Sequence, residues 1–295
     1  MDRHTAMAEF LRSRRARLRP EDVGLQPLAT RRRVPGLRRE ELAQLAGVSV
    51  DYYIRLEQGR GFHVSDAVLD AVANALRLAD DERAHLRNLA RPSRTARLPG
   101  PPQQVRPALR QLMNAMTEVP AFVVGRRTDV LAWNPLGLAL IADFRAMPPR
   151  QRNFARLFFL DEHIGALFRD QRHKARDIAA FLHLDAGRHP RDPLLAELID
   201  ELTLHSSLFR QVWPEHPVGD KRHTVYEVRH PLAGPLHLAQ EALRASDDPD
   251  QTLITYTAAP GSSSEAGLRI LASWQTHASS DHSSPRPRPG SPTTT

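Results

Sequence analysis

The architecture of the N-terminal third is governed by REELAQLAGVSVDYYIRL, residues 39–56. The spacing of this stretch meets the requirements of a helix-turn-helix, in which two short helices cross steeply through a tight turn. Ala43 provides the small side chain needed where the helix backbones approach each other, and Gly47 tolerates the positive φ of the turn. The residues expected to close the core beneath are Leu42, Ala46, Val48, Tyr53 and Leu56. We therefore predict helices over 39–46 and 50–58 in an all-α N-terminal domain.

The second helix of this motif is the predicted DNA-reading helix. Ser49 lies where its side-chain oxygen can cap that helix, so the first turn starts at Val50 and Asp51. In a helix-turn-helix this turn enters the major groove, and its outward side chains reach base edges. We expect Arg55 to contact a guanine, Val50 a thymine methyl group and Asp51 a cytosine amino group. The alternative for Asp51 and Arg55, which are four residues apart, is an ordinary ion pair on an exposed helix.

Basic residues around the motif are candidates for contact with the DNA backbone. Lys and Arg outnumber Asp and Glu by 19 to 13 in residues 1–98, but only by 22 to 21 in the remainder. Such a basic module suits a polyanionic partner. The expected backbone contacts are Arg31, Arg32, Arg33, Arg38, Arg39, Ser49 and Arg60. The alternative for the triplet at 31–33 is a solvated loop.

Composition divides the chain into four parts. Residues 1–92 form the predicted DNA-binding domain, and the Pro-rich stretch 93–104 is predicted to be an extended linker. Residues 105–275 form the second domain. Residues 276–295 are dominated by Ser, Pro, Thr and Arg, so we expect a disordered tail.

Several classes of protein are excluded by what the chain lacks. It contains no cysteine, which excludes disulfides, thiolate zinc sites, iron–sulfur clusters and a cysteine nucleophile. No stretch has the roughly 20 apolar residues needed to span a bilayer, and residues 1–8 lack the apolar core of a signal peptide. We therefore expect a soluble cytoplasmic protein, associated with the nucleoid and not with a membrane.

The second domain is predicted to mix helices with short strands. Apolar stretches bounded by turn residues predict strands over 121–125, 130–134, 225–228, 236–242 and 253–257. Helical spacing predicts helices over 105–119, 135–144, 161–184 with one break, 192–212 and 264–275. Helices combined with a small antiparallel sheet indicate an α+β fold.

The N-terminal motif resembles a known family. Residues 31–60 are similar to the Xre, or Cro/CI-type, helix-turn-helix of actinobacterial regulators. This resemblance implies a phosphate contact at Arg39 and base contacts by the three outward residues of the second helix already named. Two positions depart from the family pattern. Tyr53 replaces the usual aliphatic residue, and Val64-Ser65 replaces the Pro-Ser that commonly opens the next helix.

Segments of the second domain resemble the MmyB-like ligand-binding domain, a PAS-like fold found behind Xre domains. The matching segments are RRTDVLAWNP at 126–135, FRQVW at 209–213, HP at 230–231 and YTAAPGS at 256–262. The resemblance implies a transcription factor whose second domain holds an apolar small molecule. A fatty-acid-like ligand is the best expectation, and no other cofactor is expected.

A pocket for such a ligand would be lined by aromatic and branched side chains with a few polar anchors. The candidate lining residues are Phe122, Val124, Leu131, Trp133, Phe158, Phe159, Trp213 and Tyr256. The candidate anchors are Asn134, His205 and Arg210. The alternative is that the aromatic residues simply pack a core.

The sequence predicts neither a catalytic nor a metal site. It has no HExxH motif, and prolines interrupt the seven-residue spacing of His216, His223, His230 and His237. The segment GSSSE at 261–265 lacks the second glycine of a nucleophile elbow, and Ser264 is expected to cap the final helix instead.

These features favour a sequence-specific DNA-binding transcription regulator. We expect a homodimer that binds two half-sites of double-stranded DNA, because one small helix-turn-helix contacts few bases. Two alternatives stay open. The second domain could serve only as a dimerisation and protein-docking platform, or, more remotely, the protein could be an enzyme.

Overall fold

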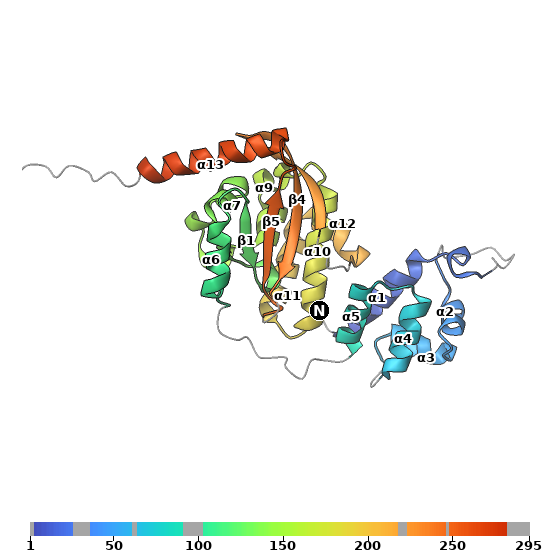
Figure 1. Cartoon of the computed structure of the whole chain (residues 1–295). Helices are drawn as coiled ribbons and strands as arrows, with labels where there is room; N and C mark the ends of the chain where they lie inside the picture. Colours follow the sequence, from blue (N-terminus) through green and yellow to red (C-terminus); the bar gives the residue numbers. More distant parts are fainter. Residues whose placement is uncertain are drawn as a thin grey trace, which may run out of the picture.

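The structure is a computed structural model that describes residues 3–25, 36–60, 64–90, 103–217, 223–245 and 248–281. Within these ranges the chain forms a helical N-terminal domain and an α+β C-terminal domain (Figure 1). Both parts of the predicted fold class are therefore confirmed. A membrane-spanning helix is absent from the described residues, since none of their helices has the required length and apolar character.

The described residues of the N-terminal domain form five helices and one 3-10 turn. Their bounds are α1 Arg3–Arg17, η1 Glu21–Val23, α2 Arg39–Leu45, α3 Val50–Glu57, α4 Asp66–Ala75 and α5 Asp80–Ala90. Helices α2 and α3 are the predicted helix-turn-helix, and Gly47 between them has a φ of +63°. Leu42, Ala43 and Tyr53 are completely buried, as the crossing of two short helices requires.

Serine side chains begin two of these helices as expected. The Oγ atoms of Ser49 and Ser65 accept hydrogen bonds from the backbone N–H groups of Tyr52 and Val68. Asp80 is the first residue of α5. There Glu82 provides the side-chain oxygen, which accepts a hydrogen bond from the N–H of Ala79.

The C-terminal domain is built on a five-stranded antiparallel sheet in the order β2-β1-β5-β4-β3. The strands are β1 Ala121–Val124, β2 Val130–Trp133, β3 His223–His230, β4 Gly234–Arg244 and β5 Thr252–Thr257. The helices are α6 Pro107–Ala115, α7 Pro135–Leu140, α8 Phe154–Leu160, α9 Glu162–Leu167, α10 Gln171–Arg188, α11 Pro193–His205, α12 Ser207–Val212 and α13 Ser263–Asp281. Short 3-10 turns are η2 Arg126–Thr128, η3 Phe144–Ala146, η4 Pro149–Gln151 and η5 Trp213–Glu215.

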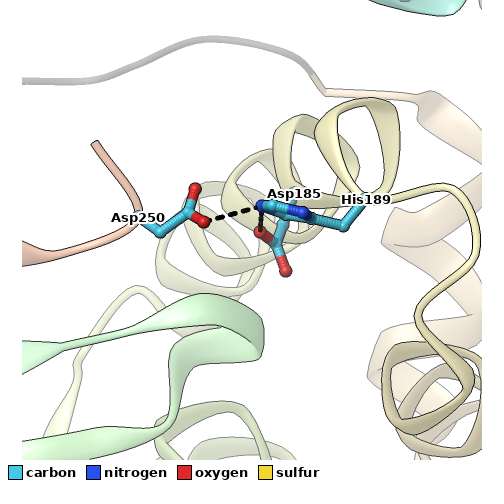
Figure 2. A group of neighbouring side chains, drawn as sticks. All are labelled: Asp185, His189 and Asp250. Carbon is cyan, nitrogen blue, oxygen red and sulfur yellow. Dashed lines mark ion pairs between the residues drawn. The ribbon is translucent and has the colours of Figure 1, made fainter. Parts of the chain in front are cut away.

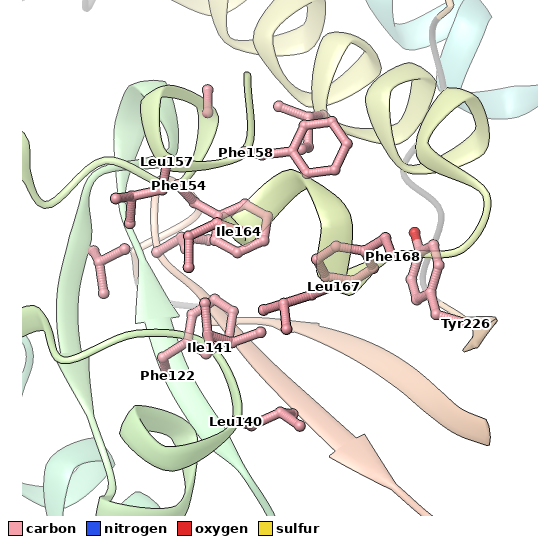
Figure 3. Packing of buried hydrophobic residues seen from close by; sticks show 14 of the residues in the cluster. Phe122, Leu140, Ile141, Phe154, Leu157, Phe158, Ile164, Leu167, Phe168 and Tyr226 are labelled. Atoms are coloured by element: carbon pink, nitrogen blue, oxygen red, sulfur yellow. The ribbon is translucent and has the colours of Figure 1, made fainter. Parts of the chain in front are cut away.

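Alternating side chains of the sheet bury two different cores. On one face Phe122, Tyr226 and Tyr256 join the aromatic cluster under α8, α9 and α10, part of which is drawn in Figure 3. On the other face Val123 and Leu253 pack with Met113 of α6. The sheet thus lies between a thin helical layer and a thick one, and the thick layer holds the candidate ligand site.

Several predicted helices of the C-terminal domain are divided or end elsewhere in the structure. The break in 161–184 falls at residues 168–170, and 192–212 is divided at Ser206, whose extended backbone and Oγ begin α12. Helix α6 ends at Ala115, and Leu112 on its predicted apolar stripe is 53% exposed. Helix α13 continues to Asp281, six residues into the stretch assigned to the disordered tail, because the first proline after it is residue 285.

Ser264 does not cap α13 as the sequence suggested. Ser262 accepts a hydrogen bond from the N–H of Glu265 at that helix start. Ser264 is buried, and its Oγ accepts a hydrogen bond from the N–H of His237 in β4. Its hydroxyl therefore joins the helix to the sheet.

The two domains contact each other directly. Helix α5 of the N-terminal domain packs against α10 of the C-terminal domain, next to α1 (Figure 1). Arg14 and Arg17 of α1 donate hydrogen bonds to the carbonyl oxygens of His216 and Glu215. The C-terminal domain therefore holds the side of the N-terminal domain formed by α1 and α5, and α3 lies outside this contact.

Candidate DNA-binding surface and ligand cavity

Helix α3 presents one face to the protein and the other to solvent. Tyr53 and Leu56 are buried on its inner face. Val50 is 37% exposed although it is apolar, and Asp51 and Arg55 are also exposed. The outward set is therefore the one that the sequence proposed for base contact. An exposed aliphatic residue at the first turn of a helix is available to a thymine methyl group.

The side chains of Asp51 and Arg55 do not pair with each other. Neither forms an ion pair or side-chain hydrogen bond with any residue in the described part of the chain. The alternative reading of their spacing, an ion pair within α3, is thus not what the structure contains. The Arg55 guanidinium therefore has no partner among the described residues, and its donors are available to DNA.

A buried carboxylate that the sequence interpretation missed fixes the motif. Glu57, at the end of α3, has no exposed side-chain surface and lies between Arg15 of α1 and Arg39 of α2. Its two oxygens are 2.8 Å from Arg15 Nε and 2.9 Å from Arg39 Nε. Burial raises the pKa of Glu57, but the hydrogen bonds from the two arginines outweigh it, and the pKa is lowered overall.

The ion pair with Glu57 gives Arg39 a structural role in addition to its proposed contact with phosphate. Its Nε is engaged with Glu57, while 41% of its side-chain surface remains exposed. The terminal nitrogens of the guanidinium remain available for the phosphate contact that the family resemblance implies for Arg39. Arg39 thus links α2 to α3 and faces solvent at the same time. Tyr53 packs beside the cluster, and burial raises the pKa of its hydroxyl.

The other proposed backbone contacts are placed as follows. Arg38 is half-buried, and its backbone N–H donates to Glu41 at the start of α2. Arg60 is exposed, and Ser49 is exposed although its Oγ caps α3. The residues Arg31, Arg32 and Arg33 lie outside the described residues.

A cavity of about 80 Å³ lies between α10 and the sheet. Of the residues proposed for the ligand pocket, Phe122, Val124 and Tyr256 line it. The other lining residues come mainly from α10 and from the facing strands: Thr128, Phe154, Lys174, Asp177, Ile178, Phe181, Leu184, Tyr226, Gln240, Ala242, Thr252 and Ile254. A mostly apolar wall with a few polar groups is typical of a small-molecule site.

The remaining aromatic candidates are located elsewhere. Phe158 and Phe159 pack edge-to-face against each other in the helical layer, and Trp213 stacks on His183. Trp133 contacts Phe144. Leu131 lies near α6 on the opposite face of the sheet. These side chains follow the core-packing alternative, because they pack against other side chains and none of them lines the cavity.

Two of the three proposed anchors have structural roles instead, and the third is exposed at a helix end. Asn134 is buried, caps α7 and donates to the carbonyl oxygens of Met116 and Val119. Arg210 is exposed and donates to two carbonyl oxygens at the end of α11, and His205 is exposed at that helix end. None of the three lines the cavity.

The basic group that faces the cavity is Lys174, which was not among the residues predicted from the sequence. It is 4% exposed, and its Nζ donates to Gln240 Oε1 at 2.7 Å and to Tyr256 Oη at 3.2 Å. The ammonium also lies 4.2 to 5.7 Å from four ring centroids, those of Tyr226, Phe168, Phe154 and Tyr256. The sequence did contain a sign that this residue is unusual, because the chain has only two lysines among its 41 Lys and Arg residues.

The electrostatics of this site are those of a cation with little countercharge. Burial lowers the pKa of Lys174 to about 7, and Asp177 on the same helix opposes that shift. Asp177 accepts a hydrogen bond from the hydroxyl of Tyr226. Burial also raises the pKa of Tyr256, so its hydroxyl stays protonated. The cavity therefore offers an ammonium group and a phenol to a ligand.

One group of residues has the composition of a metal site. Asp185 of α10, His189 directly after that helix and Asp250 before β5 bring their ligand atoms within 4.8 Å of one another (Figure 2). His189 Nε2 is 2.9 Å from Asp250, and Asp185 accepts a hydrogen bond from the N–H of Arg127. The charge of Arg126 acts on both His189 and Asp250. These contacts explain the group as an ion-paired link between α10 and the β4–β5 connection.

The histidines with seven-residue spacing do not form one site. His223 contacts Glu241, and His230 donates to the carbonyl oxygen of Ala139. His216 lies instead at the contact between the domains.

Comparison with known families agrees with both halves of the chain. Residues 105–271 match the family model described as MmyB-like transcription regulator ligand binding domain. Residues 6–86 match a helix-turn-helix domain model. No curated protein matches the chain.

Proposed function

The chain belongs to the family with the MmyB-like transcription regulator ligand binding domain, and we propose that it reads a specific operator in response to a small apolar acid. That it is a DNA-binding transcription regulator follows from the two matched domains. The proposal adds the residues that read DNA and the chemistry of the ligand. The observation that carries it is the buried Lys174 at a mostly apolar cavity.

The DNA-reading residues proposed are Val50, Asp51 and Arg55. Their support is geometric, since all three are exposed on one helix whose opposite face is buried in the domain core. Arg39 and Arg60 are proposed to hold the sugar–phosphate backbone on either side. A single helix of this length contacts few bases, so we propose a homodimer on two half-sites.

Selection of bound sequences from random duplex DNA tests this part. We expect enrichment of a two-part site with half-sites about one helical turn, or a multiple of it, apart. The affinity for the enriched site should fall steeply as the salt concentration rises, because phosphate contacts release counterions. Failure to enrich any sequence at low ionic strength would contradict the proposal.

The ligand proposed is an apolar molecule with a carboxylate, as in a fatty acid. Lys174 and Tyr256 would donate hydrogen bonds to the carboxylate, and Phe122, Ile178 and Phe181 would contact the hydrocarbon. The cavity of about 80 Å³ is small beside the roughly 300–1,000 Å³ of typical ligand sites. A short or compact acid therefore fits it better than a long chain, which would have to displace aromatic side chains.

Extraction of purified protein followed by mass spectrometry tests for a copurified acid. Calorimetry with saturated fatty acids of increasing chain length then defines the size that binds. The matched variant is Lys174→Met, which keeps the length and removes the charge. If wild type and variant bind every acid equally or not at all, the C-terminal domain is better explained as a dimerisation or docking platform. Turnover of the acid would favour the enzyme alternative.

A further inference from the structure

The contact between the two domains contains three buried histidines. His85 comes from α5, His183 from α10 and His216 from the turn after η5. Their exposed fractions are only 2 to 3%. A weak contact between domains is expected to be polar and solvated. The burial of these histidines therefore indicates a closely packed interface.

The rings are packed against one another and against aromatic neighbours. His183 stacks on Trp213 with ring centroids 3.7 Å apart. The ring centroids of His183 and His216 are 4.3 Å apart. His85 packs edge-to-face on Phe10. Across the interface the ring of His85 lies directly on Gly187 of α10, where an added Cβ would be 2.8 Å from Nδ1. Only a glycine at this position allows the helices to approach so closely.

The histidine nitrogens have few partners for an added proton. His183 Nε2 contacts the carbonyl oxygen of Trp213, and His216 Nε2 contacts Glu9. The Nδ1 atoms of His85 and His216 are buried without a hydrogen-bond partner. Protonation at either Nδ1 would bury an N–H donor that has no acceptor there, although Glu9 would partly balance the charge of His216.

The charged groups around the cluster come from every element packed there. They are Glu9, Arg14 and Arg17 of α1, Glu82 of α5, Arg172, Arg176 and Arg188 of α10, and Glu215 of η5. Arg14 is 3% exposed, pairs with Glu82 and donates to the carbonyl oxygen of His216. The interface therefore already contains a buried cation that would repel charged histidines.

We propose that α10 and η5 form a docking surface for the DNA-binding domain, and that this surface holds the domain only while His85, His183 and His216 are neutral. Protonation then releases the DNA-binding domain from the C-terminal domain. The inference does not depend on the identity of the operator or of the ligand.

The direction of the pH effect follows from proton linkage. Burial lowers the pKa of all three histidines in the docked state, with that of His85 at about 3. The undocked state has pKa values nearer the usual 6.5 or so and binds more protons. The contribution of the neutral histidines to docking is therefore fully present above about pH 6.5 and is lost progressively as the pH falls below it.

Small-angle X-ray scattering of the full chain measures docking through the radius of gyration, and circular dichroism checks that both domains stay folded. We expect the radius to increase as the pH falls from about 8 to about 5. The double variant His85→Leu with His216→Gln should shift this transition by at least about one pH unit downward, because it removes two of the three titrating groups. His163→Gln is the matched control, since that side chain is 97% exposed.

A second variant tests the surface independently of pH. Gly187→Leu suits a helix but places a side chain where His85 packs, so we expect a larger radius at pH values near 8. Adding His85→Ala to it should restore docking by making room. The proposal is overturned if Gly187→Leu stays compact, or if wild type, the double variant and His163→Gln open at the same pH.

Discussion

Single residues decide which bases the protein would read. Arg55 is exposed on α3 and has no protein partner within the described residues, so its guanidinium is available for a bidentate contact with guanine. Such a contact specifies sequence, whereas a phosphate contact does not. Arg39 differs because Glu57 holds its Nε. The two arginines should therefore give distinct results when replaced.

For Arg55→Ala we expect a loss of about 1–3 kcal/mol that is confined to one base pair of each half-site. The physical reason is the loss of two hydrogen bonds to one base. Binding to operators with all substitutions at each position measures this. Arg60→Ala is the control, because it removes an exposed charge outside α3 that is proposed to contact phosphate and so should not change base preference. An unchanged ratio of operator to random DNA affinity in Arg55→Ala would show that the register is wrong.

For Arg39→Ala we expect weaker binding to every sequence and a salt slope reduced by about one. A phosphate contact releases a counterion and carries no base information. Titrations of operator and random DNA over a range of salt concentrations provide the measurement. A loss restricted to the operator would contradict this role.

At the scale of elements, Glu57 joins α1, α2 and α3 through Arg15 and Arg39. Replacing it with Ala leaves Arg15 largely buried without its partner, so we expect a loss of about 3–5 kcal/mol in the free energy of unfolding. Glu57→Gln, which keeps the shape, should lose less. Because the folded-state pKa of Glu57 is lowered, its contribution is present above the unfolded pKa and is lost as the pH falls through the folded one. Urea denaturation at neutral and acidic pH measures both effects.

Helix α10 places a buried ammonium at the cavity, and this has a measurable effect on stability. The pKa of Lys174 is lowered to about 7, so the folded state binds fewer protons than the unfolded state between about pH 7 and 10. We expect wild type to gain stability relative to Lys174→Met as the pH rises through this range. Parallel curves from denaturant unfolding would show that the lysine is not desolvated.

At the scale of the whole molecule, α10 connects the two functions. Its residues Lys174, Ile178 and Phe181 line the cavity, while His183 and Gly187 lie at the contact with the DNA-binding domain. A ligand that moves this helix would change the position of α3 in each subunit of a dimer. This is the physical basis on which we propose that ligand and operator influence each other.

Linkage makes that coupling testable. If the acid changes operator affinity by some factor, operator DNA must change affinity for the acid by the same factor. We expect the two factors, measured by calorimetry and by DNA titration, to agree and to approach one in Gly187→Leu. Equal affinity for the acid with and without operator in wild type would rule out coupling.

The helix-turn-helix could be read from contiguous residues because its contacts are local. Ala43, Gly47 and Ser49 have the roles that their spacing predicts, and α3 turns outward the residues that a period of 3.6 assigns to that face. The strands of the C-terminal domain were likewise marked by their own apolar runs. By contrast, the cavity depends on Lys174, Gln240 and Tyr256, which lie on three different elements. Only folding of the sheet against α10 brings them together, and burial then gives this lysine its altered pKa. The histidine interface has the same origin. Packing brings together residues that are distant in the chain and removes the water around them, and this loss of water changes their chemistry.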